Sequence, residues 1–544
     1  MRPNIGGLIL GLVATALSVT PSLVPRPPIF QGLIAGLSFL LGYAVGVLLL
    51  WGLSFVIRWR PSALVLRNVW IGVGVAILLG GTILTARALV WQNDVRRLVE
   101  MEPVQGQDVL VAVLAALAVI VIGFGISAGI RRLNAVFATL FARAVVSTVV
   151  TVVAVCAVAA ASGALVMSVI DGIYADRNST VSTELIEPAS TYRSTGAGSA
   201  LSWESLGSQG RAFIAGGPTR DEIEAVTESA AVTPIRVYAG LDAGDTLADR
   251  AALAVEELER TGAFDRETLV VATTTGSGWL EPQSMDALEY LHGGDTAIVS
   301  MQYAYTPSWV SFLFDQDLPV AASTALFTAV YDAWSVLPAD ERPQLIAYGL
   351  SLGAHGMQSV FTDLDDVRER TDGAVFVGSP NGTPLWNELQ DARDAGSQPW
   401  QPVLDQGEAV RWLSSNGDFD ALAGPWNAPR VAYLQHGSDP VVWLGPRLIW
   451  AAPDWLRDGQ RAPDVSEYMR WIPGVTGLQV LVDMLMGESV PASHGHNYGD
   501  VILGAWLATT TDAEGSGSAR PSDEVLDRIQ TLIESYADLS SISE

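Results

Sequence analysis

A serine flanked by two glycines is the clearest candidate for chemistry in this chain. Residues 349–353 read GLSLG, which fits the pattern G-x-S-x-G, and they complete an apolar run that begins at Gln344. Small residues two positions before and after a serine allow a sharp turn from a strand into a helix, and this turn exposes the serine hydroxyl to a substrate. The pattern therefore predicts that Ser351 is a nucleophile.

A second stretch fits the same pattern. Residues 125–129 read GISAG, but they lie inside a long apolar run with no strand before them and no amphipathic helix after them. The strand-to-helix turn is what exposes a nucleophile of this kind. Ser127 is therefore not expected to react, and Ser351 is preferred.

A serine hydroxyl is a poor nucleophile unless a base removes its proton and a carboxylate orients that base. The chain has only five histidines, so the search for the base is short. When such a serine follows a strand of a parallel sheet, the acid and then the histidine come later in the chain, on loops after later strands. Asp439 follows the strand-like run 430–436, and His494 and His496 precede a helical segment. These positions predict a triad of Ser351, Asp439 and one histidine.

Alternatives remain for the acid and the base. His496 is nearer the start of the following helix and is favoured, although the spacing leaves His494 open. Asp439 precedes Pro440 and could instead form an Asx turn. The two histidines could also bind a metal, but no compact set of Cys, His and Asp completes a coordination sphere. No metal is expected.

Acyl transfer from a serine also needs N–H donors where negative charge develops on the carbonyl oxygen. The backbone N–H of Leu352, directly after the nucleophile, is one candidate. Gly276 and Ser277 follow the strand-like run 268–274 and are candidates for the second donor, unless they form an ordinary glycine-rich loop. Three tryptophans at the ends of predicted strands are candidates for an acyl pocket or for packing: Trp279, Trp309 and Trp443.

Strands that alternate with helices must position these residues. Six β-branched runs after residue 233 alternate with helical patterns: 234–241, 268–274, 297–305, 344–351, 373–379 and 430–436. This alternation predicts crossover connections and a mainly parallel sheet, hence an α/β domain over residues 234–510. Residues 380–430 contain four tryptophans without a clean period and are interpreted as a cap over the site or as a packed surface excursion.

The N-terminal part of the chain has a different character. Five apolar stretches occur there, at residues 5–19, 29–57, 69–86, 109–129 and 144–170. Most approach or exceed the roughly 20 residues that cross a bilayer as a helix. Residues 1–170 are therefore predicted to form an all-α transmembrane bundle of about five spans. Residues 171–233 read as a juxtamembrane linker, and residues 511–544 as an acidic linker with a C-terminal helix.

Arginines orient the predicted spans. Two connections are basic and free of acidic residues, the first with Arg58, Arg60 and Arg67 and the other with Arg131, Arg132 and Arg143. By the positive-inside rule these connections are cytoplasmic. The N-terminus is then cytoplasmic and everything after residue 170 is extracytoplasmic. If the first stretch were a removed signal peptide, the part after residue 170 would still be extracytoplasmic.

Composition excludes several functions. The chain contains no lysine, which excludes a P-loop lysine, a Schiff base and a Ser-Lys dyad, and no cofactor is expected. After residue 170, 20 arginines stand against 54 acidic residues, so nucleic acid is not an expected partner. The single cysteine, Cys156, excludes an intramolecular disulfide.

Several strings in the chain resemble one known family. They are residues 20–27 (TPSLVPRP), 260–266 (RTGAFDR), 276–279 (GSGW), 302–303 (QY), 433–440 (YLQHGSDP) and 494–498 (HGHNY), together with the GLSLG turn. The chain thus resembles the membrane-anchored α/β-hydrolases known mostly from actinobacteria, which combine a multi-span N-terminal domain with an extracytoplasmic hydrolase domain. The family often has an acidic residue where this chain has Leu350, a difference that bears on substrate tuning alone.

The resemblance implies an α/β-hydrolase fold and a serine hydrolase with poorly defined substrates. We therefore expect an esterase or lipase-like enzyme that acts on a lipid or an acylated cell-envelope ester. An acyltransferase that uses the same acyl-enzyme is the first alternative, and a catalytically silent membrane scaffold or lipid-binding protein is the other. The acyl chain and the oligomeric state do not follow from the sequence.

Overall fold

The computed structural model describes residues 4–56, 62–141, 143–182, 185–511 and 520–536. By its contacts the chain divides into two units. The first consists of residues 1–169, 446–456 and 463–486, and the second of residues 170–445, 457–462 and 487–544. All the candidate site residues belong to the second unit.

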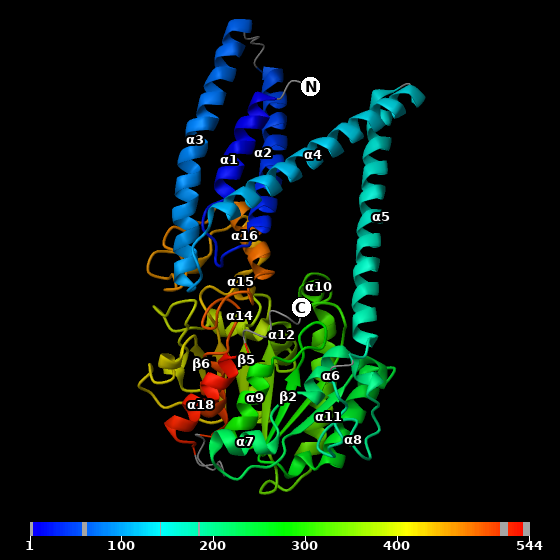
Figure 1. Ribbon diagram of the computed structural model, residues 1–544, viewed down its shortest axis with the longest axis vertical. Coiled ribbons are helices and arrows are strands. Elements are labelled where there is room, and N and C mark those ends of the chain that lie inside the picture. The colour runs from blue at the N-terminus through cyan, green and yellow to red at the C-terminus, as the bar shows by residue number, and fades with distance from the viewer. Residues whose placement is uncertain (1–3, 57–61, 142, 183–184, 512–519, 537–544) are drawn as a thin grey trace. The chain divides into compact units, whose positions relative to one another are not determined.

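Long apolar helices dominate the first unit (Figure 1). They are α1 (Ile5–Ser18), α2 (Pro28–Val56), α3 (Ala63–Leu98), α4 (Gly106–Leu140) and α5 (Ala144–Ser179), which continues into the second unit. Four of them, α2 to α5, are long and apolar enough to cross a membrane, which indicates that the chain is associated with one. At 14 residues, α1 is shorter than the roughly 20 residues that a span needs. The described residues therefore contain four such helices where about five were expected.

Glycines let α1 and α2 lie side by side. A Cβ atom on Gly46 would lie 2.3 Å from the carbonyl oxygen of Gly6, and one on Gly42 would lie 2.4 Å from that of Leu10. Between apolar helices in lipid, such close backbone approach supplies the packing that the hydrophobic effect does not. The first unit also contains α16 (Val475–Met484), which comes from far later in the sequence.

The second unit is built on a parallel sheet of seven strands. They are β1 (Ile235–Ala239), β2 (Thr268–Thr273), β3 (Thr296–Met301), β4 (Gln344–Leu350), β5 (Gly373–Val377), β6 (Val410–Leu413) and β7 (Arg430–Leu434). Their order across the sheet is β1-β3-β2-β4-β5-β7-β6, and every neighbouring pair is parallel. Almost every strand residue is buried, as expected when helices cover both faces of a sheet. The predicted α/β class is confirmed.

Strand β6 was not expected from the sequence. It lies within residues 380–430 and pairs with β7 at the edge of the sheet. It has only four residues and carries Arg411 in its middle, which hides the strand pattern. The Arg411 guanidinium is satisfied by the carbonyls of Gly407, Phe419 and Gly424. Part of this segment thus extends the sheet, while a covering role for its remainder stays a prediction.

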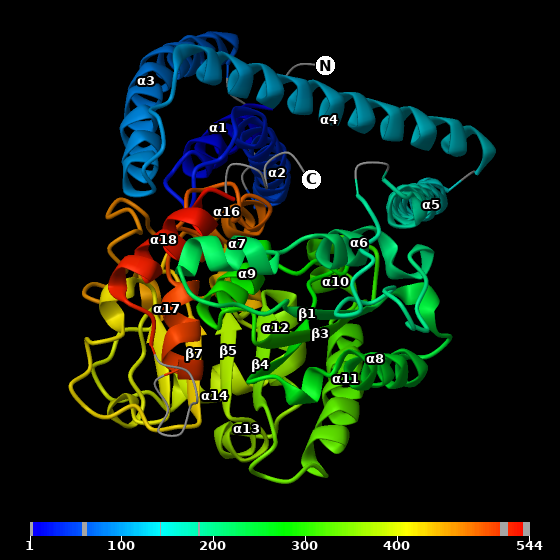
Figure 2. The same ribbon diagram turned by 60° about the horizontal axis from the view of Figure 1, so that its bottom comes forward.

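Helices cover the two faces according to their crossovers. The helices of the second unit are α6 (Gly207–Ala215), α7 (Arg220–Thr227), α8 (Leu247–Thr261), α9 (Pro282–Leu291), α10 (Ser308–Phe314), α11 (Asp317–Ser335), α12 (Leu352–Gln358), α13 (Leu364–Arg370), α14 (Pro384–Asp391), α15 (Pro440–Trp443), α17 (Ile502–Trp506) and α18 (Asp523–Glu534). Right-handed crossovers put α8, α11 and α12 on one face and α9 on the other (Figure 2). In agreement, α11 packs against α8 and α12, whereas α9 packs against α17 and α18.

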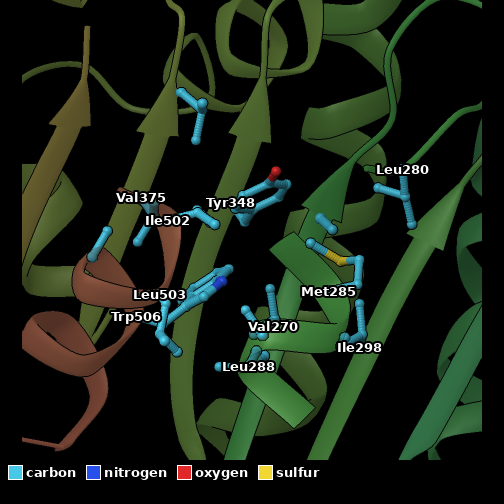
Figure 3. Close-up of a cluster of buried hydrophobic side chains, with 14 of the residues drawn as sticks. Val270, Leu280, Met285, Leu288, Ile298, Tyr348, Val375, Ile502, Leu503 and Trp506 are labelled. Atoms are coloured by element: carbon cyan, nitrogen blue, oxygen red, sulfur yellow. The ribbon is translucent and has the colours of Figure 1, made fainter. Parts of the chain in front are cut away.

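The core under α9 and α17 is visible in Figure 3. Val270, Ile298 and Tyr348 rise from β2, β3 and β4, and Met285 and Trp506 cover them from the two helices. The Tyr348 and Trp506 rings stack with centroids 5.3 Å apart, and Trp506 Nε1 donates to the Ser284 carbonyl at 2.8 Å. This packing holds β4, which leads to Ser351, in the middle of a rigid sheet.

Residues 171–233 differ from the linker expected of their polar composition. α5 continues to Ser179, and α6 and α7 follow. Trp203, Leu206 and Phe213 are buried in the core of the second unit. A few widely spaced apolar residues therefore integrate a segment whose average composition is polar.

The expected C-terminal helix is α18, and its Ile529 and Ile533 are buried in the same core. Of the acidic linker predicted before it, residues 512–519 lie outside the described residues.

Candidate active site

Ser351 lies on the turn between β4 and α12. Its φ of 54° and ψ of −122° fall in a region that side chains other than glycine rarely adopt. A Cβ atom on Gly349 would lie 2.4 Å from the Gly353 carbonyl oxygen, and one on Gly353 would lie 2.3 Å from that of Thr273. Both glycines of the pattern are therefore required by close backbone approach, as the sequence predicted.

The second match to the pattern lies inside a helix. Ser127 is part of α4, where its hydroxyl accepts a hydrogen bond from Arg131 at 2.7 Å. A continuous helix offers no strand-to-helix turn, so nothing in this environment exposes Ser127 as a nucleophile.

Asp439 and His496 are in direct contact, although 57 residues separate them. Oδ2 of Asp439 accepts from Nδ1 of His496 at 2.7 Å, and Oδ1 accepts from the backbone N–H of Val441 at 2.8 Å. Exposure is 0% for Asp439 and 4% for His496. Asp439 is the N-cap of α15, so the Asx-type contact and the histidine contact occur together.

This contact assigns the His496 tautomer. With Nδ1–H donated to the carboxylate, Nε2 carries the lone pair of the neutral ring. Nε2 is buried and has no hydrogen-bond partner among the residues that the structure describes. It is therefore the nitrogen available to accept a proton.

The segment Val377–Gly378 at the end of β5 connects the serine to the histidine. The Ser351 N–H donates to the Val377 carbonyl at 2.8 Å. The next residue, Gly378, has a φ of 54°, and a Cβ atom on it would lie 2.4 Å from Cε1 of His496. Ser351 and His496 thus border consecutive residues, Val377 and Gly378.

Tyr498 is a site residue that the sequence analysis did not single out. Its hydroxyl donates to Oδ2 of Asp439 at 2.6 Å, beside the contact from His496. The ring stacks on His436 with centroids 4.3 Å apart. The position two residues after His496 is a weak local signal, and only the fold brings this hydroxyl to the carboxylate.

Carboxylates set the electrostatics of the histidine. Burial opposes the charged imidazolium, but the Asp439 carboxylate more than offsets this and raises the pKa of His496, with smaller contributions from Glu488 and Glu281. Burial raises the pKa of Glu281 to about 7, and its hydrogen bond from Ser284 at 2.5 Å acts in the opposite direction. Glu281 follows the loop that carries the predicted oxyanion donors Gly276 and Ser277. Like Tyr498, it influences His496 and was not singled out by the sequence analysis.

His494 lies on the same loop as His496, whose Nδ1 is bonded to Asp439. It is partly exposed and forms an isolated bridge with Asn497, which begins a turn around Gly495. The N–H of Gly495 donates to the Ser438 hydroxyl at 2.9 Å, which fixes this loop beside Asp439. Of the two candidate histidines, the structure brings His496 to the acid.

The predicted oxyanion donors lie at two neighbouring backbone segments. Leu352 is the first residue of α12, and Gly353 packs against the carbonyls of Thr273 and Thr274 at the end of β2. The loop that carries Gly276 and Ser277 therefore begins directly beside the start of α12. Their role as donors stays a prediction.

The three candidate pocket tryptophans have different surroundings. Trp443 is buried, donates from Nε1 to the Gly437 carbonyl at 2.8 Å and packs edge-on against Trp386. Trp279 packs against the hydrophobic core, and Trp309 is partly exposed on α10. Packing thus accounts for Trp443 and Trp279, and a role in binding an acyl chain stays a prediction for all three.

No group of three or more His, Cys, Asp or Glu side chains that could hold a metal occurs within the described part of the chain. The arrangement of polar groups at the site is that of an acid, a histidine and a serine. Such a set can transfer a proton from a hydroxyl to an imidazole that a carboxylate orients.

A parallel sheet with a serine on the sharp turn after a central strand, an acid after a later strand and a histidine beyond it defines the α/β-hydrolase class. Comparison with known families agrees. Residues 235–520 match the profile described as the Alpha/beta-hydrolase family, and residues 19–218 match the profile of that family's N-terminus. The chain belongs to this family, and its fold and family indicate a hydrolase-type enzyme. No curated protein and no solved structure matches the chain.

Proposed function

We propose that this protein is a membrane-anchored serine esterase in which Ser351 is the nucleophile, His496 the base and Asp439 the residue that orients the base. One observation carries the proposal. Ser351, in its strained turn, donates its N–H to Val377, and Gly378 packs against the His496 ring that is bound to Asp439. Strained backbone at a serine next to an oriented imidazole is a costly arrangement that a structural role does not require.

The reaction follows from these positions. Nε2 of His496 takes the proton of the Ser351 hydroxyl while Oγ attacks the ester carbonyl carbon, and the negative charge passes to the carbonyl oxygen. The N–H of Leu352 and an N–H of Gly276 or Ser277 stabilise this oxyanion. The C–O bond to the alcohol then breaks, and the alcohol leaves with the proton from His496. Water attacks the acyl-serine by the same steps, releases the acid and returns the proton to Ser351.

Asp439 and Tyr498 act through His496. The carboxylate holds Nδ1–H and stabilises the imidazolium that forms in each transition state. The Tyr498 hydroxyl occupies the other side of the same oxygen, at 2.6 Å, so the carboxylate cannot rotate away from His496 without losing a hydrogen bond.

The expected substrate is an ester of a lipid or of an acylated cell-envelope component. The support is the continuity of the second unit with four long apolar helices, which keeps the enzyme at a lipid surface. The basic connections of the N-terminal part favour an extracytoplasmic second unit. Labelling of Ser351 in intact cells by a membrane-impermeant fluorophosphonate would support an extracytoplasmic second unit. Labelling only after lysis would contradict it.

The nucleophile is tested by fluorophosphonate labelling of membranes that contain the full chain. Ser351→Ala is expected to abolish labelling, and equal labelling of this variant and the wild type would refute the proposal. His496→Ala and His494→Ala form a matched pair two residues apart. The first should reduce the labelling rate by roughly 10³-fold or more, and the second by only a few-fold.

A further inference from the structure

The loop after β2, residues 275–279, is a turn that its own hydrogen bonds close. The N–H groups of Gly278 and Trp279 both donate to the Thr275 carbonyl, at 2.8 and 3.2 Å, and the Thr275 N–H donates to the Trp279 carbonyl at 3.0 Å. These bonds are enough to form the turn. Any further contact therefore fixes where the turn lies relative to the sheet.

Two buried side chains make such contacts with consecutive carbonyls of the 275–279 loop. Nε2 of Gln302 donates to the Ser277 carbonyl at 2.9 Å, and the Tyr238 hydroxyl donates to the Gly278 carbonyl at 2.7 Å. Both side chains belong to residues with 0% exposure. A Cβ atom on Gly278 would lie 2.4 Å from the Tyr238 hydroxyl and 2.8 Å from Cγ of Gln302. The loop is thus pressed directly onto the two side chains that hold it.

Gln302, the residue after β3, is itself held on all sides. Its N–H donates to the Ala239 carbonyl at 2.9 Å, and its carbonyl accepts from Nη1 of Arg250 at 2.7 Å. Nε2 also donates to Oδ1 of Asn178 at 2.9 Å, and Oε1 accepts from the Leu241 N–H at 3.4 Å. All of these residues belong to the second unit. The amide that holds the Ser277 carbonyl therefore has a fixed position and a fixed orientation.

The two candidate donors of this loop differ in what their N–H groups contact. Burial raises the pKa of Tyr303, and the backbone N–H of Gly276 acts in the opposite direction, so this N–H is directed at the Tyr303 hydroxyl. Ser277 is partly exposed, and its N–H donates to no residue that the structure describes. A fixed N–H that no protein group uses is what a developing oxyanion requires. Ser277 is therefore the better donor of the two.

The other predicted donor lies on a neighbouring segment. Leu352 begins α12, and a Cβ atom on the next residue, Gly353, would lie 2.3 Å from the Thr273 carbonyl oxygen at the end of β2. The 275–279 loop starts two residues after Thr273. The start of α12 is thus fixed to the sheet, and the distance between the two donors depends on how the loop is held.

We infer that Gln302 and Tyr238 are positioning residues for the second oxyanion donor, which is the N–H of Ser277. This inference rests on the proposed function, since it concerns acyl transfer at Ser351. Gln302 holds the carbonyl of the same residue that carries the donor, and Tyr238 holds the next carbonyl. Without these two bonds the closed turn can shift and rotate as a unit, and the N–H leaves the place where the oxyanion forms.

The test measures fluorophosphonate labelling of the full-length protein in nanodiscs. The maximal rate constant, the half-saturating probe concentration and the final labelled fraction are recorded from pH 5 to 9. Gln302→Met, which keeps the length of the side chain, should lower the maximal rate constant about 10- to 100-fold. The half-saturating concentration should change less than about twofold, because an oxyanion donor acts mainly in the transition state. The pH midpoint should not move, because the contact between His496 and Asp439 is untouched.

Tyr238→Phe removes the second bond to the loop and should lower the maximal rate constant roughly 10-fold, with the same two quantities unchanged. The double variant with Gln302→Met should lose less than the product of the two single effects, because both side chains hold one loop.

Trp334→Phe is the matched control. Trp334, on α11, also holds a backbone carbonyl, that of Pro343 at 2.8 Å, but Pro343 precedes β4 and so lies at the opposite edge of the sheet. This variant should melt at a lower temperature than the wild type. Its maximal rate constant, half-saturating concentration and pH midpoint should equal those of the wild type.

The outcomes separate the inference from the proposed function. If Gln302→Met lowers only the labelled fraction or the melting temperature, the side chain serves folding alone and the inference is wrong. A pH midpoint that moves together with the rate also overturns it, because the variant then acts on His496. If Gln302→Met yields no folded protein, Tyr238→Phe decides by the same measurements. If the wild type itself is not labelled at Ser351, the proposed function fails, and the inference fails with it.

Discussion

Gly378 and the imidazole of His496 are packed so closely that no side chain fits between them. A Cβ atom on Gly378 would lie 2.4 Å from Cε1 and 2.7 Å from Nδ1, the atom that is bonded to Asp439. Gly378 also has a φ of 54°, which most residues avoid. The histidine is thus held by the backbone on one side and by a carboxylate on the other.

Gly378→Ala should therefore displace the ring of His496. We expect the labelling rate of Ser351 to fall roughly 100-fold or more, because the added methyl group occupies the space of Cε1. Gly382→Ala serves as the control, since a Cβ atom there meets nothing within 4 Å. Equal labelling rates for the two variants would contradict the close packing of Gly378 against His496.

Tyr498→Phe removes one of the hydrogen bonds to Oδ2 of Asp439 and keeps the stack on His436. The rate should fall roughly 10-fold, since a hydrogen bond to a charged group contributes about 1.5–3 kcal/mol. Tyr433→Phe is the comparison, because it also removes a buried hydroxyl, here bonded to Gln358 at 2.8 Å. It should lower the thermal stability without changing the rate.

Asp439→Asn tests the origin of the pKa shift. The Asp439 carboxylate raises the pKa of His496, and a base must be neutral, so wild-type activity rises as the pH passes above that raised pKa. In the variant the pKa of His496 falls, so the rise of activity on the acidic side of the pH–rate profile should move to lower pH. The maximal rate should drop by roughly 10⁴-fold. If this rise of activity stays at the wild-type pH, a group other than His496 governs it.

Glu281→Gln should change stability in a pH-dependent way. The pKa of Glu281 is raised by burial from 4.5 to about 7, so the unfolded chain loses its proton first and stability falls as the pH rises between these values. The uncharged variant avoids this cost, which is at most about 3 kcal/mol above pH 7. We expect a higher melting temperature than wild type at pH 8 and nearly the same one at pH 4.5. Glu259→Gln, on the exposed surface of α8, should change neither.

Local signals predicted the strands and the serine turn well. The strand-to-helix turn at Ser351 depends on glycines two positions away, and the β-branched runs that became β1 to β5 and β7 are contiguous in sequence. Both are short-range properties of the backbone, so they can be seen in one sequence.

Segments whose structure depends on distant partners were predicted less well. β6 is a four-residue strand that exists because β7 lies beside it, and its Arg411 is satisfied by carbonyls of the surrounding loops. Trp203 is buried although its neighbours Ser202, Glu204 and Ser205 are polar. In each case the burial comes from elements elsewhere in the chain, which composition and periodicity do not report.

By itself, the sequence determined the α/β class, the apolar character of the N-terminal helices and the strained turn at Ser351, because each arises from neighbouring residues. The tertiary structure decided the rest of the site. The sequence favoured His496 but left His494 open, and only the fold brings His496 within 2.7 Å of Asp439 and adds the Tyr498 hydroxyl. The reason is physical: a hydrogen bond or buried ion pair between residues far apart in sequence exists only when the whole fold holds both partners in place and removes water from them.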